Sequence, residues 1–309
     1  MEFNRAAFDK RFDRAVLWGH KLHSHTHSYI HNAFFRAFTY LGVNALWLDD
    51  RDDISKLDLS RSLFITEGQV DDNIPIRDDS HYVTHNCRSD KYKPLYGNNK
   101  CISIQVYTDD ALKRNLDKRD TCTFFDVPGK CAYITWATDL LPDEIEANKP
   151  QIAFNQNSKN VFWIGTIGGQ RFGNIDQITP FMQAAAQNHI NFVKRGGVSV
   201  EENIKLVKDS YMAPTIVGAW QLEVGYVPCR IFKNISYGQF GLTNSPRVAE
   251  LFEGKIVCNT DTNRLFYDSR DYLSGLPLSE LHALMDVVKE KHTYVNRINT
   301  LLEFIEMTS

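Results

Sequence analysis

The chain has 309 residues, of which 43% are hydrophobic and 24% are charged, and its net charge is −3 at neutral pH. This composition is that of a globular protein, and the length favours two domains of about 150 residues each. The absence of a basic excess argues against a nucleic-acid partner. No apolar stretch reaches the roughly 18 residues of a membrane-spanning helix. Charges also interrupt the first residues, so we expect no secretory signal and a cytoplasmic protein.

The first half of the chain alternates short apolar runs with polar loops. Residues 15–18 predict a strand, residues 27–41 predict a helix from their apolar spacing, and Gly42 stands where a C-cap glycine belongs. Residues 45–48 then predict a second strand, which makes a strand–helix–strand unit of a parallel, doubly wound sheet. Further strands are expected at residues 63–66, 81–84, 101–106 and 132–135.

The composition becomes polar between residues 141 and 159, where we place a linker between residues 1–150 and residues 151–309. A second Rossmann-like series is expected beyond it. Its strands are predicted at 161–164, 190–193, 212–217, 241–243 and 256–258, and its helices at 175–189, 199–208, 228–237 and, in two pieces, 278–307. The predicted fold class is therefore α/β, with two Rossmann-like domains facing across a cleft, a C-terminal helical tail, and ligands beyond the carboxyl ends of the strands.

Five of the ten histidines lie between His20 and His31, after the first predicted strand. Histidine titrates near neutral pH and can accept the proton of a hydroxyl group. The catalytic candidates are His23, His25 and His27, with His25 preferred as the base because it stands in the middle of the loop. His20 is a candidate for acceptor binding, and His31, inside the helix, is expected to be structural. This interpretation needs no metal, although H-x-H-x-H spacing leaves a metal site open.

Two further polar residues follow predicted strands in the first half. Glu67 is a catalytic candidate because a carboxylate at a strand end can act as a base or orient a histidine. His85, at the end of the next strand, is a candidate for acceptor binding. The six cysteines are widely spaced and contain no C-x-x-C pair, so we expect free thiols.

The second half carries the residues expected to bind phosphate. Gly168 and Arg171 belong to a glycine-rich segment whose backbone can approach a diphosphate closely. Arg230 and Lys233 are three residues apart and share one face of a predicted helix. The helix N-terminus and these two cations would together stabilise a leaving diphosphate without a metal ion.

The segment from Pro228 to Gly238 resembles the element P-x-R-x-F-E-x-x-x-x-G of the two-Rossmann (GT-B) glycosyltransferases, most of all the family 1-like group that includes the spore-maturation type. A second similarity, to H-T-Y-x-x-R-x-x-x-L-L, begins at His292. The resemblance covers residues 160–305 and implies that the C-terminal half holds a nucleotide-sugar donor. Lys233 replaces the usual glutamate of the element, and Glu223 could supply a carboxylate instead. The remaining donor-binding candidates are Trp220, Asn234, Ser236, Tyr237 and Asn244.

We therefore expect a metal-independent glycosyltransferase with a GT-B fold and no cofactor. It would move a hexosyl or deoxyhexosyl group from a GDP- or UDP-linked donor to a glycan or other hydroxyl acceptor, with a histidine or glutamate as general base. The alternatives are a metal-dependent hydrolase that uses the histidine-rich loop, a non-catalytic nucleotide-sugar-binding protein, and a sugar-phosphate epimerase of the same two-domain shape.

Overall fold

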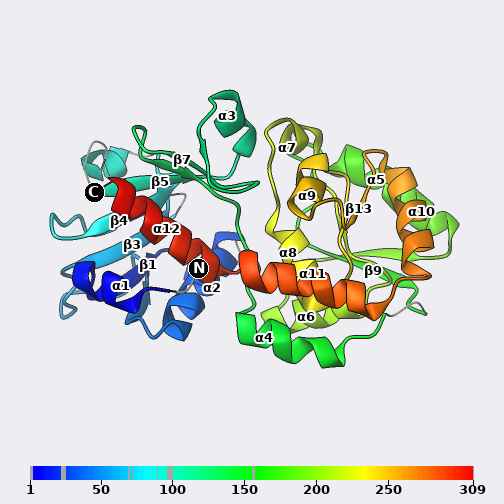
Figure 1. The fold of residues 1–309 in the computed structure, drawn as a ribbon, viewed down its shortest axis with the longest axis horizontal. Helices are drawn as coiled ribbons and strands as arrows, with labels where there is room; N and C mark the ends of the chain where they lie inside the picture. The colour runs from blue at the N-terminus through cyan, green and yellow to red at the C-terminus, as the bar shows by residue number, and fades with distance from the viewer. Residues whose placement is uncertain are drawn as a thin grey trace. The chain divides into compact units, whose positions relative to one another are not determined.

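The protein is described by a computed structural model, which has an α/β fold (Figure 1). The structure describes residues 3–21, 26–68, 70–71, 73–88, 90–95, 100–154 and 157–308. The chain divides into two compact units. Unit 1 comprises Met1–Val106, Arg114–Leu141 and Thr293–Ser309, and unit 2 comprises Tyr107–Lys113 and Pro142–His292. No helix within the described residues is long and apolar enough to cross a membrane.

Unit 1 is built on an eight-stranded mixed sheet with the order β2-β1-β3-β4-β5-β8-β7-β6. Its strands are β1 (Arg14–Trp18), β2 (Ala45–Leu48), β3 (Ser62–Glu67), β4 (His81–His85), β5 (Cys101–Gln105), β6 (Asp117–Lys118), β7 (Phe124–Asp126) and β8 (Cys131–Tyr133). The strands from β2 to β8 in this order are parallel, and β7 and β6 continue the sheet in antiparallel pairing. The chain passes from β1 to β2 on one side and then to β3 on the other, so the winding reverses between β1 and β3.

Helices α1 (Arg5–Arg11), α2 (Thr26–Tyr40) and α12 (Tyr294–Thr308) belong to unit 1, together with the 3-10 helix η1 (Asp90–Leu95). In Figure 1 the C-terminal helix α12, in red, lies over the sheet near the blue α1 and α2. Aromatic rings of α12 make contacts with α2 and β7. The ring centroids of Phe34 in α2 and Tyr294 in α12 are 4.6 Å apart, and those of Phe125 in β7 and Phe304 in α12 are 4.7 Å apart. A second apolar cluster includes Val16, Phe64 and Tyr82, which point from successive strands, so the central strands are buried almost throughout.

Unit 2 contains two small parallel sheets. One pairs β9 (Asn160–Ile164) with β10 (Asn191–Arg195), and the other has the order β11 (Pro214–Thr215), β12 (Leu242–Thr243) and β13 (Val257–Cys258). The helices are α3 (Thr108–Lys113), α4 (Pro142–Asn148), α5 (Ile175–Gln187), α6 (Val200–Lys208), α7 (Ala219–Glu223), α8 (Cys229–Tyr237), α9 (Pro246–Leu251), α10 (Thr262–Leu273) and α11 (Leu278–Lys291), with the 3-10 helix η2 (Lys149–Gln151).

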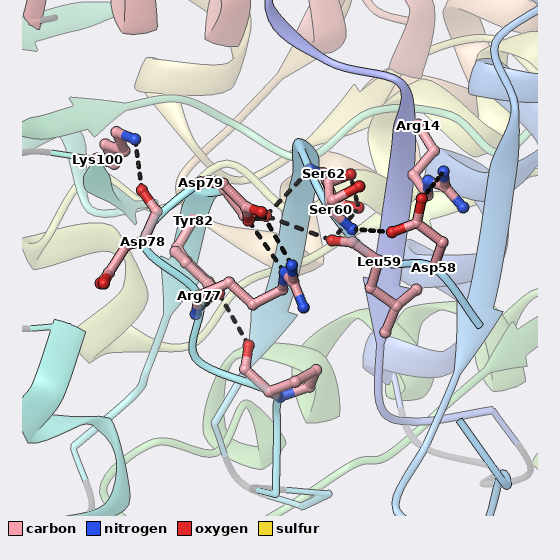
Figure 2. Close-up of polar contacts among 12 residues, drawn as sticks. Arg14, Asp58, Leu59, Ser60, Ser62, Arg77, Asp78, Asp79, Tyr82 and Lys100 are labelled. Carbon is pink, nitrogen blue, oxygen red and sulfur yellow. Dashed lines mark hydrogen bonds and ion pairs between the residues drawn. The ribbon is translucent and has the colours of Figure 1, made fainter. Parts of the chain in front are cut away.

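The amino edge of the unit 1 sheet, where β1, β3 and β4 begin, carries a polar network (Figure 2). Arg77 pairs through two hydrogen bonds, of 3.0 and 2.9 Å, with Asp79. The buried hydroxyl of Ser80 donates to Asp79 at 2.9 Å and accepts the backbone N–H of Ser62 at 3.1 Å. The Tyr82 hydroxyl accepts the N–H of Arg77 at 2.8 Å. These contacts satisfy backbone groups at the points where the strands start.

Most of the predicted elements are present with boundaries that differ by no more than two residues. Gly42 has a φ of 74°, as a C-cap glycine requires, and Ser199 caps α6 by accepting the N–H of Glu202. The strand predicted at 212–217 is shorter, because only Pro214–Thr215 pairs in a sheet. The β6–β7 hairpin and α1 lay outside the predicted elements.

Within the segment predicted as a linker, residues 142–151 form α4 and η2. Helix α4 packs on α8 and α11 through its fully buried Ile145, and Asn148 donates to the carbonyl of Ser236 at 2.9 Å. The polar composition of the segment is therefore that of the exposed face of an amphipathic helix. The expected division into residues 1–150 and 151–309 also differs at its end, because α12 packs against α2 and belongs to unit 1.

Candidate active site

The carboxyl edge of the unit 1 sheet brings His20 and Glu67 together. His20 lies two residues beyond β1, and Glu67 is the last residue of the neighbouring β3. The His20 Nε2 and the Glu67 Oε2 atoms are 2.7 Å apart, and both side chains are only 1% exposed. This pair lies where the winding of the sheet reverses, which is the position where open α/β sheets bind ligands.

The backbone beside this pair is strained. Gly19 and His20 have φ values of 91° and 59°, and a positive φ is uncommon for a residue other than glycine. The N–H of His20 donates to the Asp71 carboxylate at 2.8 Å, which holds the turn. Strain of this kind costs about 1–3 kcal/mol per residue and gathers at functional sites. The turn directs the His20 ring onto Glu67 instead of along the strand.

Two more side chains converge on Glu67. The Asn86 amide, which follows β4, donates to Oε1 at 3.2 Å. His27, in the first turn of α2, places its Nδ1 3.7 Å from Oε2. The rings of His20 and His27 are 5.4 Å apart. The Glu67 carboxylate is thus surrounded by two imidazoles and an amide and is almost completely shielded from solvent.

His31 lies one turn after His27 on α2 and is structural, as the sequence predicts. Its Nδ1–H donates to the carbonyl of Gly19 at 2.9 Å, and burial lowers the pKa of its imidazole to about 4. The ring is therefore neutral near pH 7. It fixes the glycine that precedes His20.

His85, the acceptor-binding candidate at the end of β4, is buried. Its Nδ1–H donates to the carbonyl of Ile104 at 3.0 Å, and burial lowers its pKa. The ring meets Trp136 edge-on at 5.0 Å and lies 5.6 Å from the His27 ring. His85 and Trp136 thus form one wall of the space around His27.

The motif that begins at His292 supports this wall. Arg297 of α12 is buried and donates to the carbonyls of Thr135 at 2.7 Å and Trp136 at 3.2 Å. Burial lowers the pKa of the Arg297 guanidinium. The motif therefore has a packing role in unit 1, where it anchors α12 and the backbone of Trp136.

The preferred base, His25, and its neighbour His23 lie outside the described residues. Of the histidines that the structure describes in this segment, His27 combines contact with Glu67 and measurable exposure, at 9%. An open pocket of about 600 Å³ in unit 1 is lined by Asn86 and Lys130, among other residues. Asn86 therefore stands between Glu67 and a space large enough for a sugar-sized molecule.

The loops beyond β9, β11 and β12 are joined to one another in unit 2. Asn244, after β12, accepts the N–H of Val217 at 2.9 Å and donates to its carbonyl at 3.0 Å. Gly218 lies directly on the carbonyl of Gly173, at the end of the glycine-rich loop, with no room for a Cβ atom. Gly168 is held in the same loop by Asn174 and by the N–H of Ile175.

Arg230 lies in the first turn of α8 beside the end of β9. Its guanidinium stacks on the Trp163 ring, 3.8 Å from the centroid, and donates to the carbonyl of Ile164 at 2.6 Å. Burial lowers its pKa to about 10, so it stays charged near pH 7. No carboxylate in the described part of the chain forms an ion pair with it. Pro228 at the N-cap has no side-chain cap, which leaves N–H groups of the first turn for a ligand.

One exposed and two half-buried aromatic rings lie together at this loop. Phe172 is 60% exposed, and its ring meets that of Trp220 edge-on at 4.7 Å. Tyr107 packs on the other side of Trp220 at 5.1 Å. Arg171 is exposed, with its guanidinium 5.6 Å from the Phe172 ring, and Glu223 is exposed at the end of α7.

The remaining donor-binding candidates are placed differently. Asn234 donates to the carbonyl of Ala213 at 2.9 Å, and Ser236 donates to that of Lys233 at 3.0 Å. Both are buried, as are Tyr237 and Asn244, so these four side chains hold the core of unit 2. Lys233 is half-buried, with its Nζ 5.8 Å from the Tyr237 ring.

Two residues of unit 2 were missed by sequence reasoning. Phe172 stands next to Arg171 in the glycine-rich segment, where an aromatic residue in a polar loop is itself a signal. Nothing in the sequence near Tyr107 indicates its contact with Trp220.

Comparisons with known proteins give similarity in structure but none in sequence. No protein-family model matches the chain, and no curated protein matches it. Among solved structures, the chain is similar to trehalose-6-phosphate synthase from a study of glycosyl transfer with retention that used bisubstrate glycomimetics. The TM-score is 0.43 at 9% sequence identity, and the match covers 91% of this chain and 78% of the other.

Proposed function

We propose that this protein transfers a sugar from a nucleoside-diphosphate donor to a hydroxyl acceptor. The observation that carries the proposal is the half-buried, charged guanidinium of Arg230 at the N-terminus of α8. Trp163 and Ile164 fix its position, so it is preorganised for an anion. The surrounding segment, Pro228–Gly238, is the one that resembles the donor-binding element of GT-B glycosyltransferases.

Unit 2 is assigned the donor. The diphosphate would bind Arg230, the N–H groups of the first turn of α8 and the glycine-rich loop, with Lys233 and Arg171 adding positive charge. The exposed Phe172 and the half-buried Trp220 offer ring surface for the nucleobase. We infer that units 1 and 2 correspond to the acceptor and donor domains of a GT-B enzyme.

Unit 1 is assigned the general base, His27. Its Nδ1 faces Glu67, which favours the tautomer with the proton on Nδ1 and leaves Nε2 to accept the proton of the acceptor hydroxyl. The acceptor oxygen then bonds to the anomeric carbon as the bond from that carbon to the diphosphate oxygen breaks. Glu67 stabilises the resulting imidazolium, and His20 and Asn86 hold Glu67 in position.

Titration calorimetry with UDP and GDP in the presence of EDTA tests this proposal. We expect the intact chain to bind one of the two, and Arg230→Gln to weaken that binding about 10-fold or more, since a charge-assisted contact is worth roughly 1.5–3 kcal/mol. Arg264→Gln, at an exposed arginine of the same unit, is the matched control and should bind normally. Failure of both nucleotides to bind, or equal affinity in the two variants, would contradict the assignment.

A further inference from the structure

We propose that His20, His27 and Glu67 form a binding site for one divalent transition-metal ion of the zinc class. One ligand atom from each of these three residues lies within 4.8 Å of the other two, and all three residues are buried. Two imidazoles and one carboxylate are a common donor set for zinc, with a fourth position left for water or a ligand. This site does not depend on the transferase function, because it lies wholly in unit 1 and needs no nucleotide.

The distances suit a single ion. Zinc bonds to nitrogen and oxygen are about 2.0–2.2 Å, so two donors on one tetrahedral ion lie roughly 3.3 Å apart. The separations from Glu67 Oε2 are 2.7 Å to His20 and 3.7 Å to His27, on either side of this value. Shifts of about half an ångström in the two rings would therefore bring both separations from Glu67 to this value.

The surroundings of the three residues also suit a metal ion. Asn86 donates to the second oxygen of Glu67, which leaves Oε2 directed at the histidines. The Asp71 carboxylate accepts the N–H of His20 and adds negative charge close to the site. The strained turn at Gly19 and His20 holds the first ligand in place before any ion arrives. Partial exposure of the His27 side chain, at 11%, gives the ion a way in.

The chemistry implies competition with the base. A metal ion on His27 Nδ1 and Glu67 Oε2 would displace the proton that lies between His20 and Glu67 and would break the contact that orients His27. Inhibition, unlike metal binding itself, rests on the proposed transferase function: bound zinc inhibits sugar transfer, and a chelator does not reduce it. The same three residues would then bind either a proton or the metal ion.

The experiment is a titration of the full-length chain with Co²⁺ and Zn²⁺ after treatment with chelator. We expect one ion per chain and the visible absorption of tetrahedral Co²⁺, which Zn²⁺ removes. His20→Asn should lower the affinity by about 100-fold or more, and Asn86→Ala, which removes a supporting contact, by about 10–100-fold. Both outcomes are read without any activity measurement.

His189→Asn is the matched control. His189 also has a positive φ, of 58°, but it lies in unit 2, and asparagine tolerates this conformation at both positions. The control should bind metal as the unaltered chain does. An absence of tetrahedral Co²⁺ absorption in the folded intact chain, or equal losses in the His20 and His189 variants, would overturn the proposal.

Discussion

The two edges of the unit 1 sheet both carry polar side chains, but they hold them in different ways. At the amino edge, Arg77 and Asp79 pair with each other while 38% and 41% exposed. At the carboxyl edge, His20 and Glu67 are 1% exposed. An exposed ion pair costs little desolvation free energy to form and contributes little to stability, whereas burying ionisable groups costs several kcal/mol in desolvation. The comparison indicates that the amino edge organises the strand starts, and it supports the proposal that the carboxyl edge is the place of chemistry.

The largest expected effect lies at the carboxyl edge. We expect His27→Gln and Glu67→Gln each to lower kcat for sugar transfer by about 100-fold, because a positioned base contributes 10²–10⁴-fold. Since the two residues act as a pair, the double variant should be little worse than either single one. Donor affinity, measured by calorimetry, should not change, which separates this role from a structural one.

Independent losses in the double variant would contradict the pairing of these two residues. A weakened donor affinity in Glu67→Gln would do the same. Glu67→Asp, which keeps the charge, should recover part of the turnover and thereby distinguish loss of charge from loss of packing.

The next largest expected effect is on nucleotide binding by unit 2, where polar and aromatic side chains also lie beyond the ends of the strands. Phe172→Ala should weaken nucleoside-diphosphate binding by about 10-fold, because stacking of a base on an aromatic ring is worth about 1–3 kcal/mol. Binding of pyrophosphate, which has no base, should stay the same. Phe172→Trp should restore nucleotide binding, and an equal loss for both ligands would show that Phe172 acts only through the loop.

At the amino edge, a substitution should change stability and leave turnover intact. Ser80→Ala removes the hydroxyl that accepts the buried N–H of Ser62, and an unsatisfied buried donor costs about 1–3 kcal/mol. Urea unfolding measures this loss, with Ser279→Ala on the exposed face of α11 as the control. A fall in turnover without a fall in stability would break the distinction between the two edges.

The smallest effect is a pH dependence of stability at the amino edge. The Arg77 guanidinium lowers the pKa of the Asp79 carboxyl from 3.8 to about 2. A depressed carboxyl pKa stabilises the fold above the unfolded value of 3.8 and loses this contribution as the pH falls through 2. The pair is exposed, so Asp79→Asn should cost less than about 1 kcal/mol near pH 7. Urea unfolding from pH 7 to pH 2 should show the difference shrink, and a difference as large at pH 2 as at pH 7 would contradict the assignment.

The strands of unit 1 could be predicted from sequence because short apolar runs bounded by polar residues describe buried parallel strands directly. Helix α4 could not be predicted in this way, because only Ile145 of its seven residues is both apolar and fully buried. The remaining polar residues have the composition of a linker. Helix α8 shows a second limit. It was predicted correctly as a helix, yet Asn234 and Ser236 are polar residues on its buried side, where they bond to backbone carbonyls.

The candidate site was predictable only in part. Loop position identified His20, His27 and Glu67 as separate candidates, since each stands next to a strand end or a helix start. Their meeting depends on the order of strands, which places β3 beside β1 although 47 residues separate His20 from Glu67. No local pattern carries that order. The preference for His25 came from its place in the loop, and it stays a prediction because His25 lies outside the described residues. His27 is the base that we propose from its contact with Glu67.

The most direct test of the account is the release of nucleoside diphosphate from UDP-linked and GDP-linked sugars by the intact chain in EDTA. The account predicts chelator-insensitive release from one class of donor, lost in His27→Gln and retained in Ser80→Ala. Release that requires a metal ion would instead favour a metal-dependent hydrolase, and donor binding without release would favour a non-catalytic binding protein. Either result would contradict the proposed transferase.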